Sequence, residues 1–197
     1  MLAPKDTATR ERRSLDGLWK FMLDPDGTGR RDRWYEQLPP GAVEMPVPSS
    51  YNDVLADPAG RDHVGDVWYE TSFRIPPSWA GRRIAIRFGS ATHRADVWVN
   101  GQPVAVHQGG YTPFEADITA VATPGQESRV TVAVSNVLTW QTIPPGYLED
   151  TAGGRRDAEG LPDNVLASRA SDGSANRRSD RHRGIRQNGS PSQCCSL

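Results

Sequence analysis

The side chains that could do acid–base chemistry or stack on a sugar ring are four histidines and six tryptophans. His93 is the first candidate for a general base. No serine, cysteine or acidic motif lies at a spacing that would let it activate a nucleophile. We therefore predict that His93 is a hydrogen-bonded structural residue at the start of a strand.

The six tryptophans could form a platform that stacks on the C–H face of a sugar. Large aromatic side chains within strand patterns are, however, well accounted for by packing in a core. We predict that most of the six are core residues and that any exception is Trp34 or Trp140. The two glycines in the run His107–Tyr111 are expected to allow a positive φ where the chain turns.

Other sequence features argue against several classes of site. Cys194 and Cys195 are adjacent and have no CxxC or histidine partner spacing, so we predict no disulfide framework. We also predict no metal site and no cofactor. The basic run 177–186 could bind RNA, but it has no aromatic side chain on which a base could stack. A formal net charge of -1 gives no general attraction to nucleic acid or an anionic membrane.

Several short segments alternate apolar and polar residues with the period of a half-buried strand. Ile84, Ile86 and Phe88 share one face of such a segment, and two arginines lie on the other. The same alternation occurs in segments 19–23, 95–99 and 130–134. We expect these segments to form the β-strands of the domain.

Turn signals separate the alternating segments. Asn100-Gly101 is a strong hairpin signal, because a type I′ turn needs two consecutive positive φ angles. Pro76-Pro77 and Pro124-Gly125 close other segments. No amphipathic helix of useful length is evident. The sequence therefore predicts an all-β fold, a sandwich or a jelly roll.

The composition changes sharply near residue 150. All fifteen aromatic residues lie between Trp19 and Tyr147, whereas residues 151–197 contain eight arginines, seven serines and six glycines. Such a segment buries too little apolar surface to offset about 1–2 kcal/mol of backbone entropy per ordered residue. We predict one domain over residues 1–150 and a disordered Arg/Ser/Gly-rich tail over residues 151–197.

Taken in order, blocks of residues 1–150 resemble the opening of the β-glucuronidases of glycoside hydrolase family two. The matching blocks are TRE at 9–11, LDGLW at 15–19, VPSSYND at 47–53, VWYE at 67–70, WAGRR at 79–83, RFGSATH at 87–93, VWVNG at 97–101, HQGGYTPFEAD at 107–117 and WQTIPPG at 140–146. The resemblance implies a galactose-binding-like jelly-roll sugar-binding domain, followed in the family by a second sandwich and a TIM barrel.

The resemblance also implies where catalysis takes place. Both catalytic glutamates of the family belong to the barrel, so we expect no catalytic residue in this chain and no activity of the chain alone. In related galactosidases, a loop before the Val67 strand touches substrate. Asp62 and His63 are therefore the candidate substrate-binding residues, through hydrogen bonds to a sugar hydroxyl. The alternative is that they form a solvated turn.

The resemblance ends around residues 151–156, so we expect a truncated relative whose sandwich lacks its last strand. Carbohydrate, a glucuronide, is then a partner only in a full-length parent, and the open sheet edge could cause self-association. We expect no nucleic-acid or membrane partner. Met1–Arg13 lacks the apolar stretch of a signal peptide, which predicts a cytoplasmic protein. Two alternative functions stay open: a stand-alone carbohydrate-binding module, and nucleic-acid binding through the basic tail.

Overall fold

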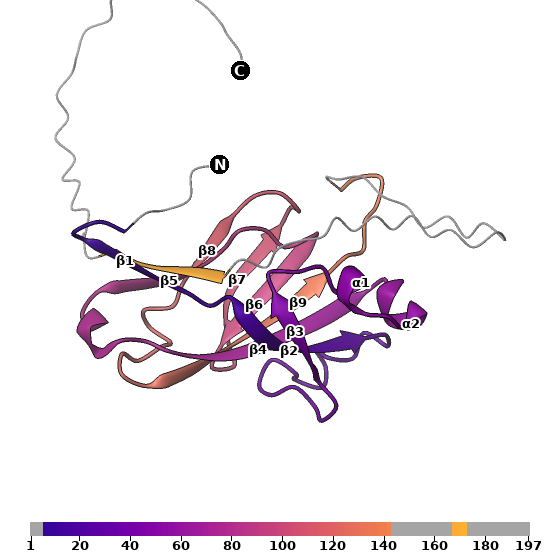
Figure 1. Cartoon of the computed structure of the whole chain (residues 1–197), viewed down its shortest axis with the longest axis horizontal. Helices are drawn as coiled ribbons and strands as arrows, with labels where there is room; N and C mark the ends of the chain where they lie inside the picture. Colours follow the sequence, from indigo (N-terminus) through magenta and orange to yellow (C-terminus); the bar gives the residue numbers. More distant parts are fainter. Residues whose placement is uncertain (1–5, 143–166, 173–197) are drawn as a thin grey trace, which may run out of the picture.

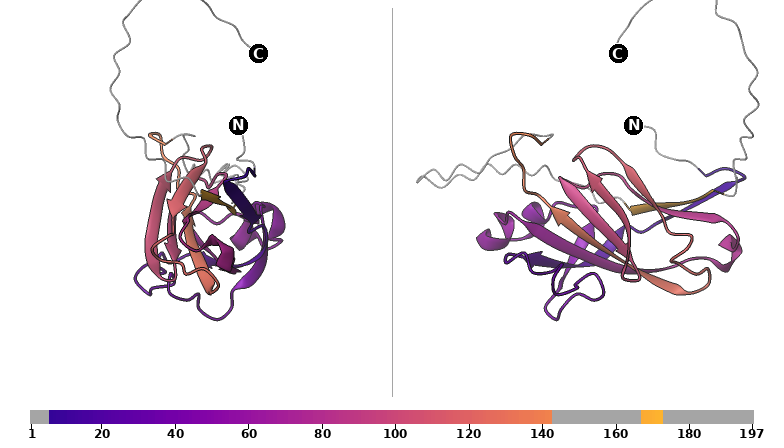
Figure 2. Two further views of the ribbon diagram at one scale, coloured as in Figure 1. Left: turned by 90° about the vertical axis from the view of Figure 1, so that its left-hand side faces the viewer. Right: turned by 180° about the vertical axis from the view of Figure 1, so that it is seen from behind.

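The computed structural model describes residues 6–142 and a strand at residues 167–172. Its strands form two antiparallel sheets that lie face to face (Figures 1 and 2). One sheet has four strands in the order β1 (Arg10–Ser14), β10 (Ala167–Asp172), β5 (Arg83–Phe88) and β8 (Phe114–Asp117). The other has six in the order β3 (Val43–Val47), β2 (Gly17–Asp24), β4 (Asp66–Arg74), β9 (Glu127–Ser135), β6 (Arg94–Val99) and β7 (Gln102–Gln108). The fold is the predicted jelly-roll β-sandwich.

The core lies between the two sheets and follows the predicted alternation. Ile84, Ile86 and Phe88 of β5 point into it and are at most 1% exposed. The six-stranded sheet contributes alternate residues from four strands: Trp19 and Phe21 of β2, Val67 and Tyr69 of β4, Ala95, Val97 and Val99 of β6, and Val130, Val132 and Val134 of β9. Burial of these side chains from both sheets is the main stabilising contribution to the fold.

The hairpin between β6 and β7 has the predicted turn. Asn100 and Gly101 have φ angles of 52° and 78°, the two consecutive positive values that a type I′ turn requires. The Asn100 side chain also accepts a hydrogen bond from the Arg129 backbone N–H at 2.9 Å and donates one to the Val121 carbonyl at 2.8 Å. The turn is therefore fixed to neighbouring segments as well as by its own backbone.

The structure differs from the sequence prediction at strand β10. We predicted that the sandwich lacks its last strand and that the whole segment 151–197 is disordered. Instead, Ala167–Asp172 pairs antiparallel with β1 on one side and β5 on the other. Backbone hydrogen bonds can form a strand from residues of almost any type, so the composition of these six residues does not prevent the pairing. The domain bounds of 1–150 and 151–197 stay a prediction. The remainder of that segment lies outside the described residues.

A second, smaller apolar cluster covers the outer face of the six-stranded sheet. Trp68 of β4 points away from the main core, yet it is fully buried because the segment 25–42 folds over it. Its ring stacks on Trp98 at 5.5 Å and meets Trp34 edge to face at 5.9 Å. Leu38 is buried in the same cluster as Trp68. Two apolar layers therefore enclose this sheet.

Buried carboxylates fasten the segment 25–42 to the sheet. Asp24 accepts hydrogen bonds from the backbone N–H groups of Thr28 and Gly29, both at 2.8 Å, and from Trp68 Nε1 at 3.1 Å. Arg30 pairs with both Asp66 and Asp96. A buried carboxylate is tolerated because such partners replace its hydration.

Two short helices lie together at one end of the sandwich, α1 (Tyr51–Val54) and α2 (Pro58–Arg61) (Figure 1). A single 3-10 turn, η1 (Pro77–Trp79), precedes β5. Within the residues that the structure describes, no helix is long and apolar enough to cross a membrane.

Candidate functional site

The candidate residues Asp62 and His63 lie in the loop that carries α1 and α2, residues 51–65. Local sequence explains why α2 forms: Pro58 occupies its first turn, and the Asp57 carboxylate caps it by accepting the Gly60 N–H at 3.1 Å. The chain then leaves the helix at Asp62 and enters β4 at Asp66.

A polar cluster beneath this loop fastens it to the end of β9. The Asn136 side chain accepts a hydrogen bond from the Gly65 N–H at 2.8 Å and donates to the Tyr51 hydroxyl at 2.6 Å and the His63 carbonyl at 2.9 Å. The Tyr51 hydroxyl in turn donates to the same His63 carbonyl at 3.0 Å. Burial raises the pKa of Tyr51 to about 12, so this hydroxyl stays protonated at neutral pH.

The structure separates the roles of the two candidate residues. His63 is 9% exposed, and its Nε2 lies 3.0 Å from the Asp66 carbonyl. Burial lowers the pKa of His63, and the charge of Asp24 opposes this shift only in part. The Asp62 side chain, in contrast, is 45% exposed and pairs with Arg61 at 3.2 Å. Of the two, only Asp62 presents a charged group to solvent.

Two further polar or aromatic residues belong to this loop or to the segment after β9. Asn52 donates a hydrogen bond to the Arg61 carbonyl, which ties α1 to the end of α2. Trp140 follows Asn136 by four residues and is 74% exposed. The prediction that Trp140 is an exception to core packing is confirmed.

Four of the other five tryptophans agree with the prediction of core packing. Trp19, Trp68 and Trp79 are at most 1% exposed, and Trp98 is half-buried in the outer cluster. Trp34, the other residue named as an exception, is half-buried and covers Trp68, so it is not an exception. These five rings belong to the two apolar clusters.

His93 holds the start of β6 in place, as predicted. Its backbone N–H donates to Ser135 at 2.7 Å, and its carbonyl accepts from Gly109 at 2.8 Å. Burial lowers the pKa of its ring, and the charge of nearby His107 lowers it further. Gly109 has a φ of 134°, as expected for the turn, and a Cβ on Gly110 would lie 2.7 Å from Thr92 Oγ1. Gly109 therefore has the expected positive φ, whereas Gly110 does not have one and instead allows this close approach.

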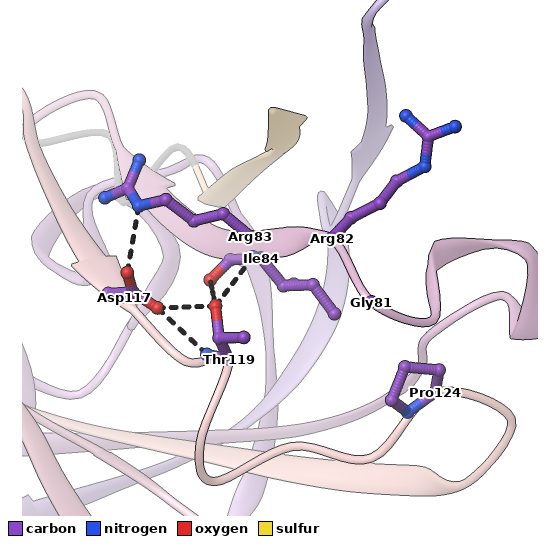
Figure 3. A pocket seen from close by; sticks show the side chains of 7 residues that line it. All are labelled: Gly81, Arg82, Arg83, Ile84, Asp117, Thr119 and Pro124. Carbon is purple, nitrogen blue, oxygen red and sulfur yellow. Dashed lines mark hydrogen bonds and ion pairs between the residues drawn. The ribbon is translucent and has the colours of Figure 1, made fainter. Parts of the chain in front are cut away.

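A pocket of about 420 Å³ opens beside the start of β5 (Figure 3). Arg83 pairs with Asp117 at 2.9 Å, and Asp117 also accepts from the Thr119 hydroxyl at 2.7 Å. The residues that line the pocket are Gly81, Arg82, Arg83, Ile84, Asp117, Thr119 and Pro124. They include no aromatic ring on which a sugar could stack.

Sequence reasoning missed the residues that position the candidate loop. Tyr51 and Asn52 belong to the block at 47–53 that supports the family resemblance, and Asn136 directly follows the alternating strand β9. A buried asparagine at the end of a strand is the signal that could have indicated a fastening point. In residues 6–142, no group of three or more His, Cys, Asp or Glu side chains could hold a metal ion.

Comparison with known sequences identifies the family of the chain. Residues 12–164 match the family model described as "Glycosyl hydrolases family 2, sugar binding domain". A β-glucuronidase of Paenibacillus borealis is 57% identical over 149 residues, which cover 76% of this chain and 25% of that protein. The β-glucuronidase of Canis lupus familiaris is 46% identical over 161 residues, which cover 75% of this chain and 24% of that protein. The chain spans about a quarter of the length of these relatives.

Comparison with solved structures also finds β-glucuronidases. The β-glucuronidase of Ruminococcus gnavus in complex with D-glucuronic acid superposes with a TM-score of 0.77 at 37% identity, over 87% of this chain and 31% of that one. A β-glucuronidase from an uncultured Clostridium species gives a TM-score of 0.76 at 38% identity, over 87% of this chain and 30% of that one. The chain belongs to glycosyl hydrolase family 2 and corresponds to the sugar-binding domain of that family.

Proposed function

We propose that this chain is the non-catalytic domain of a β-glucuronidase, which hydrolyses β-D-glucuronides with retention and without a metal. The observation that carries the proposal is the 57% identity over 149 residues with the Paenibacillus borealis β-glucuronidase. The likeness to the Ruminococcus gnavus enzyme with D-glucuronic acid supports it. Neither alternative, a stand-alone sugar-binding module or a nucleic-acid-binding protein, is favoured by these similarities.

In this proposal, the end of the sandwich at residues 51–65 faces the substrate of the whole enzyme. Asp62 is the residue that contacts a sugar hydroxyl, because its carboxylate is exposed. His63 acts as a positioning residue, because its ring is buried and lies 3.0 Å from the Asp66 carbonyl. Asn136 keeps both residues in place through the His63 carbonyl and the Gly65 N–H.

Self-association through a sheet edge is a further proposal for the isolated chain. The edge strands of the six-stranded sheet, β3 and β7, contain Pro46 and Pro103, and proline supplies no N–H for pairing with another strand. An associating copy would therefore use β1 or β8, the edges of the four-stranded sheet. We propose no nucleic-acid partner, given the formal net charge of -1.

We expect the purified chain to hydrolyse no aryl β-glucuronide. A retaining mechanism needs an acid and a nucleophile whose carboxyl groups lie about 5–5.5 Å apart across the glycosidic bond. The buried carboxylates Asp24, Glu70 and Asp96 are already engaged by hydrogen bonds or ion pairs on the outer face of the sheet. The measurement is release of the aryl alcohol, with the Paenibacillus borealis enzyme as positive control.

A matched preparation from cells that lack the gene controls for contaminating glycosidases. Turnover that exceeds this preparation and stays with the chain through a second purification would contradict the proposed non-catalytic role.

A further inference from the structure

The turn between β6 and β7 contains an Asn-Gly sequence, and such a sequence is open to a spontaneous reaction. The backbone nitrogen of the glycine can attack the side-chain amide carbon of the asparagine and release ammonia. Glycine favours the attack because it has no Cβ that would hinder it and its backbone is the least restricted of all residues. In this chain, Asn100 is an exposed residue and Gly101 follows it, so water and hydroxide reach the site.

Water is the only co-reactant that the reaction needs. Hydroxide removes the proton of the Gly101 nitrogen, which then forms a bond to Cγ of Asn100. The Cγ–Nδ2 bond breaks, and the amide leaves as ammonia after it takes up a proton from water. Water then opens the cyclic imide, at one carbonyl to give aspartate and at the other to give isoaspartate, in which the backbone passes through Cβ and Cγ.

In the folded chain, hydrogen bonds hold Asn100 in place. Its Oδ1 accepts from the Arg129 N–H at 2.9 Å, and its Nδ2 donates to the Val121 carbonyl at 2.8 Å. Its backbone N–H donates to the Arg129 carbonyl, also at 2.9 Å. To be attacked, the side chain must rotate toward the Gly101 nitrogen, which takes both ends of the amide away from these partners. The turn therefore has to open before Asn100 reacts.

Opening of the turn has consequences for the sheet, because β6 lies between β7 and β9. Val97 and Val99 of β6 are core residues and are 1% and 0% exposed. The Asn100 side chain joins the end of this strand to β9 at Arg129 and to the preceding loop at Val121. One side-chain amide thus fastens the hairpin to two other segments.

We propose that Asn100 is a latent deamidation site that the folded hairpin keeps unreactive. It reacts only in chains whose turn between β6 and β7 has opened, and the product does not fasten the turn again. An aspartate has no N–H to donate, so a carboxylate oxygen would face the Val121 carbonyl. An isoaspartate lengthens the backbone of a two-residue turn. Deamidation thereby makes a reversible opening permanent. This inference is independent of the proposed enzymatic role.

The first test compares the deamidation rates of the full chain at mildly alkaline pH, folded in buffer and unfolded in urea. Trypsin digestion and mass spectrometry follow the fragment that contains Asn100, whose mass rises when the amide becomes an acid. A synthetic peptide of residues 97–104, in buffer and in the same urea, gives the intrinsic rate and corrects for the effect of urea on the reaction.

We expect Asn100 to react at least about tenfold more slowly in the folded chain than in the unfolded chain, because only the open fraction is reactive. The unfolded chain and the peptide should react at similar rates. Equal rates in the folded and unfolded chains would overturn the proposal, since the hairpin would then give no protection. Absence of the reaction in the unfolded chain would overturn it as well.

The second test asks whether the product can fasten the turn. Asn100→Asp reproduces the aspartate product, and aspartate tolerates a positive φ much as asparagine does, so the substitution isolates the loss of the donor. Asn188→Asp, the same change in the chain's other Asn-Gly sequence, is the matched control.

Asn100→Asp should lower the melting temperature by several degrees more than Asn188→Asp does, because the Val121 carbonyl loses its donor. Equal melting temperatures would show that an aspartate fastens the turn as well as the asparagine and would overturn the proposal. The first test uses the unmodified chain, so it does not depend on the folding of this variant.

Discussion

Replacing Trp68 with alanine should lower the free energy of unfolding by about 3–5 kcal/mol, the usual cost of truncating a fully buried tryptophan. Trp68 is 0% exposed although it lies on the outer face of its sheet. The change removes its stack on Trp98 and takes away a hydrogen-bond donor to buried Asp24. Since the free energy of unfolding of a whole domain is about 5–15 kcal/mol, this change would remove much of the stability of the domain. Urea denaturation followed by circular dichroism measures the effect.

Trp140→Ala is the matched control, since this ring is 74% exposed. It should change the free energy of unfolding by less than about 0.5 kcal/mol. If Trp68→Ala were as mild as Trp140→Ala, segment 25–42 would not form a second core. Gly29→Ala tests the same packing from the other side, because its Cβ would lie 2.5 Å from Trp68 Nε1.

Replacing Asn136 with alanine should lower the free energy of unfolding by about 1–3 kcal/mol, because the Gly65 N–H loses its acceptor. The Tyr51 hydroxyl and the His63 carbonyl retain their mutual bond of 3.0 Å, which limits the loss. The loop of residues 51–65 should also open more often. Limited proteolysis at Arg61 and urea denaturation measure the two effects.

Thr139→Ala, in the exposed turn beyond Asn136, is the control for a change close by. It should leave cleavage at Arg61 as slow as in the wild type. Cleavage that is equally slow in Asn136→Ala would show that the loop is held by other contacts, and Asn136 would lose its positioning role.

Much of the fold could be predicted because two simple signals dominate it. Alternation placed Ile84, Ile86 and Phe88 in the core, and the two positive φ angles at Asn100-Gly101 follow from residue type. Both signals are local in sequence. The resemblance to β-glucuronidases likewise depended on blocks that can be read in order along the chain.

The outer-face cluster could not be predicted in this way. In an alternating strand, Trp68 occupies a position that the pattern assigns to solvent, and only the fold of segment 25–42 covers it. Strand β10 was missed because composition says little about backbone pairing. The partners of Asn136 are as many as 85 residues away in sequence, so the support of the candidate loop is visible only in three dimensions.

The most direct test of the central claim is a graft into a working enzyme. The segment of the Paenibacillus borealis β-glucuronidase that aligns with this chain over 149 residues is replaced by the corresponding residues of this chain. A parallel graft takes the segment from the Canis lupus familiaris enzyme, which is 46% identical to this chain. We predict that the graft from this chain is soluble and hydrolyses an aryl β-glucuronide with kcat/KM within about tenfold of the parent, a change of about 1.4 kcal/mol. A folded graft from this chain without glucuronidase activity, beside an active graft from the Canis enzyme, would contradict the account.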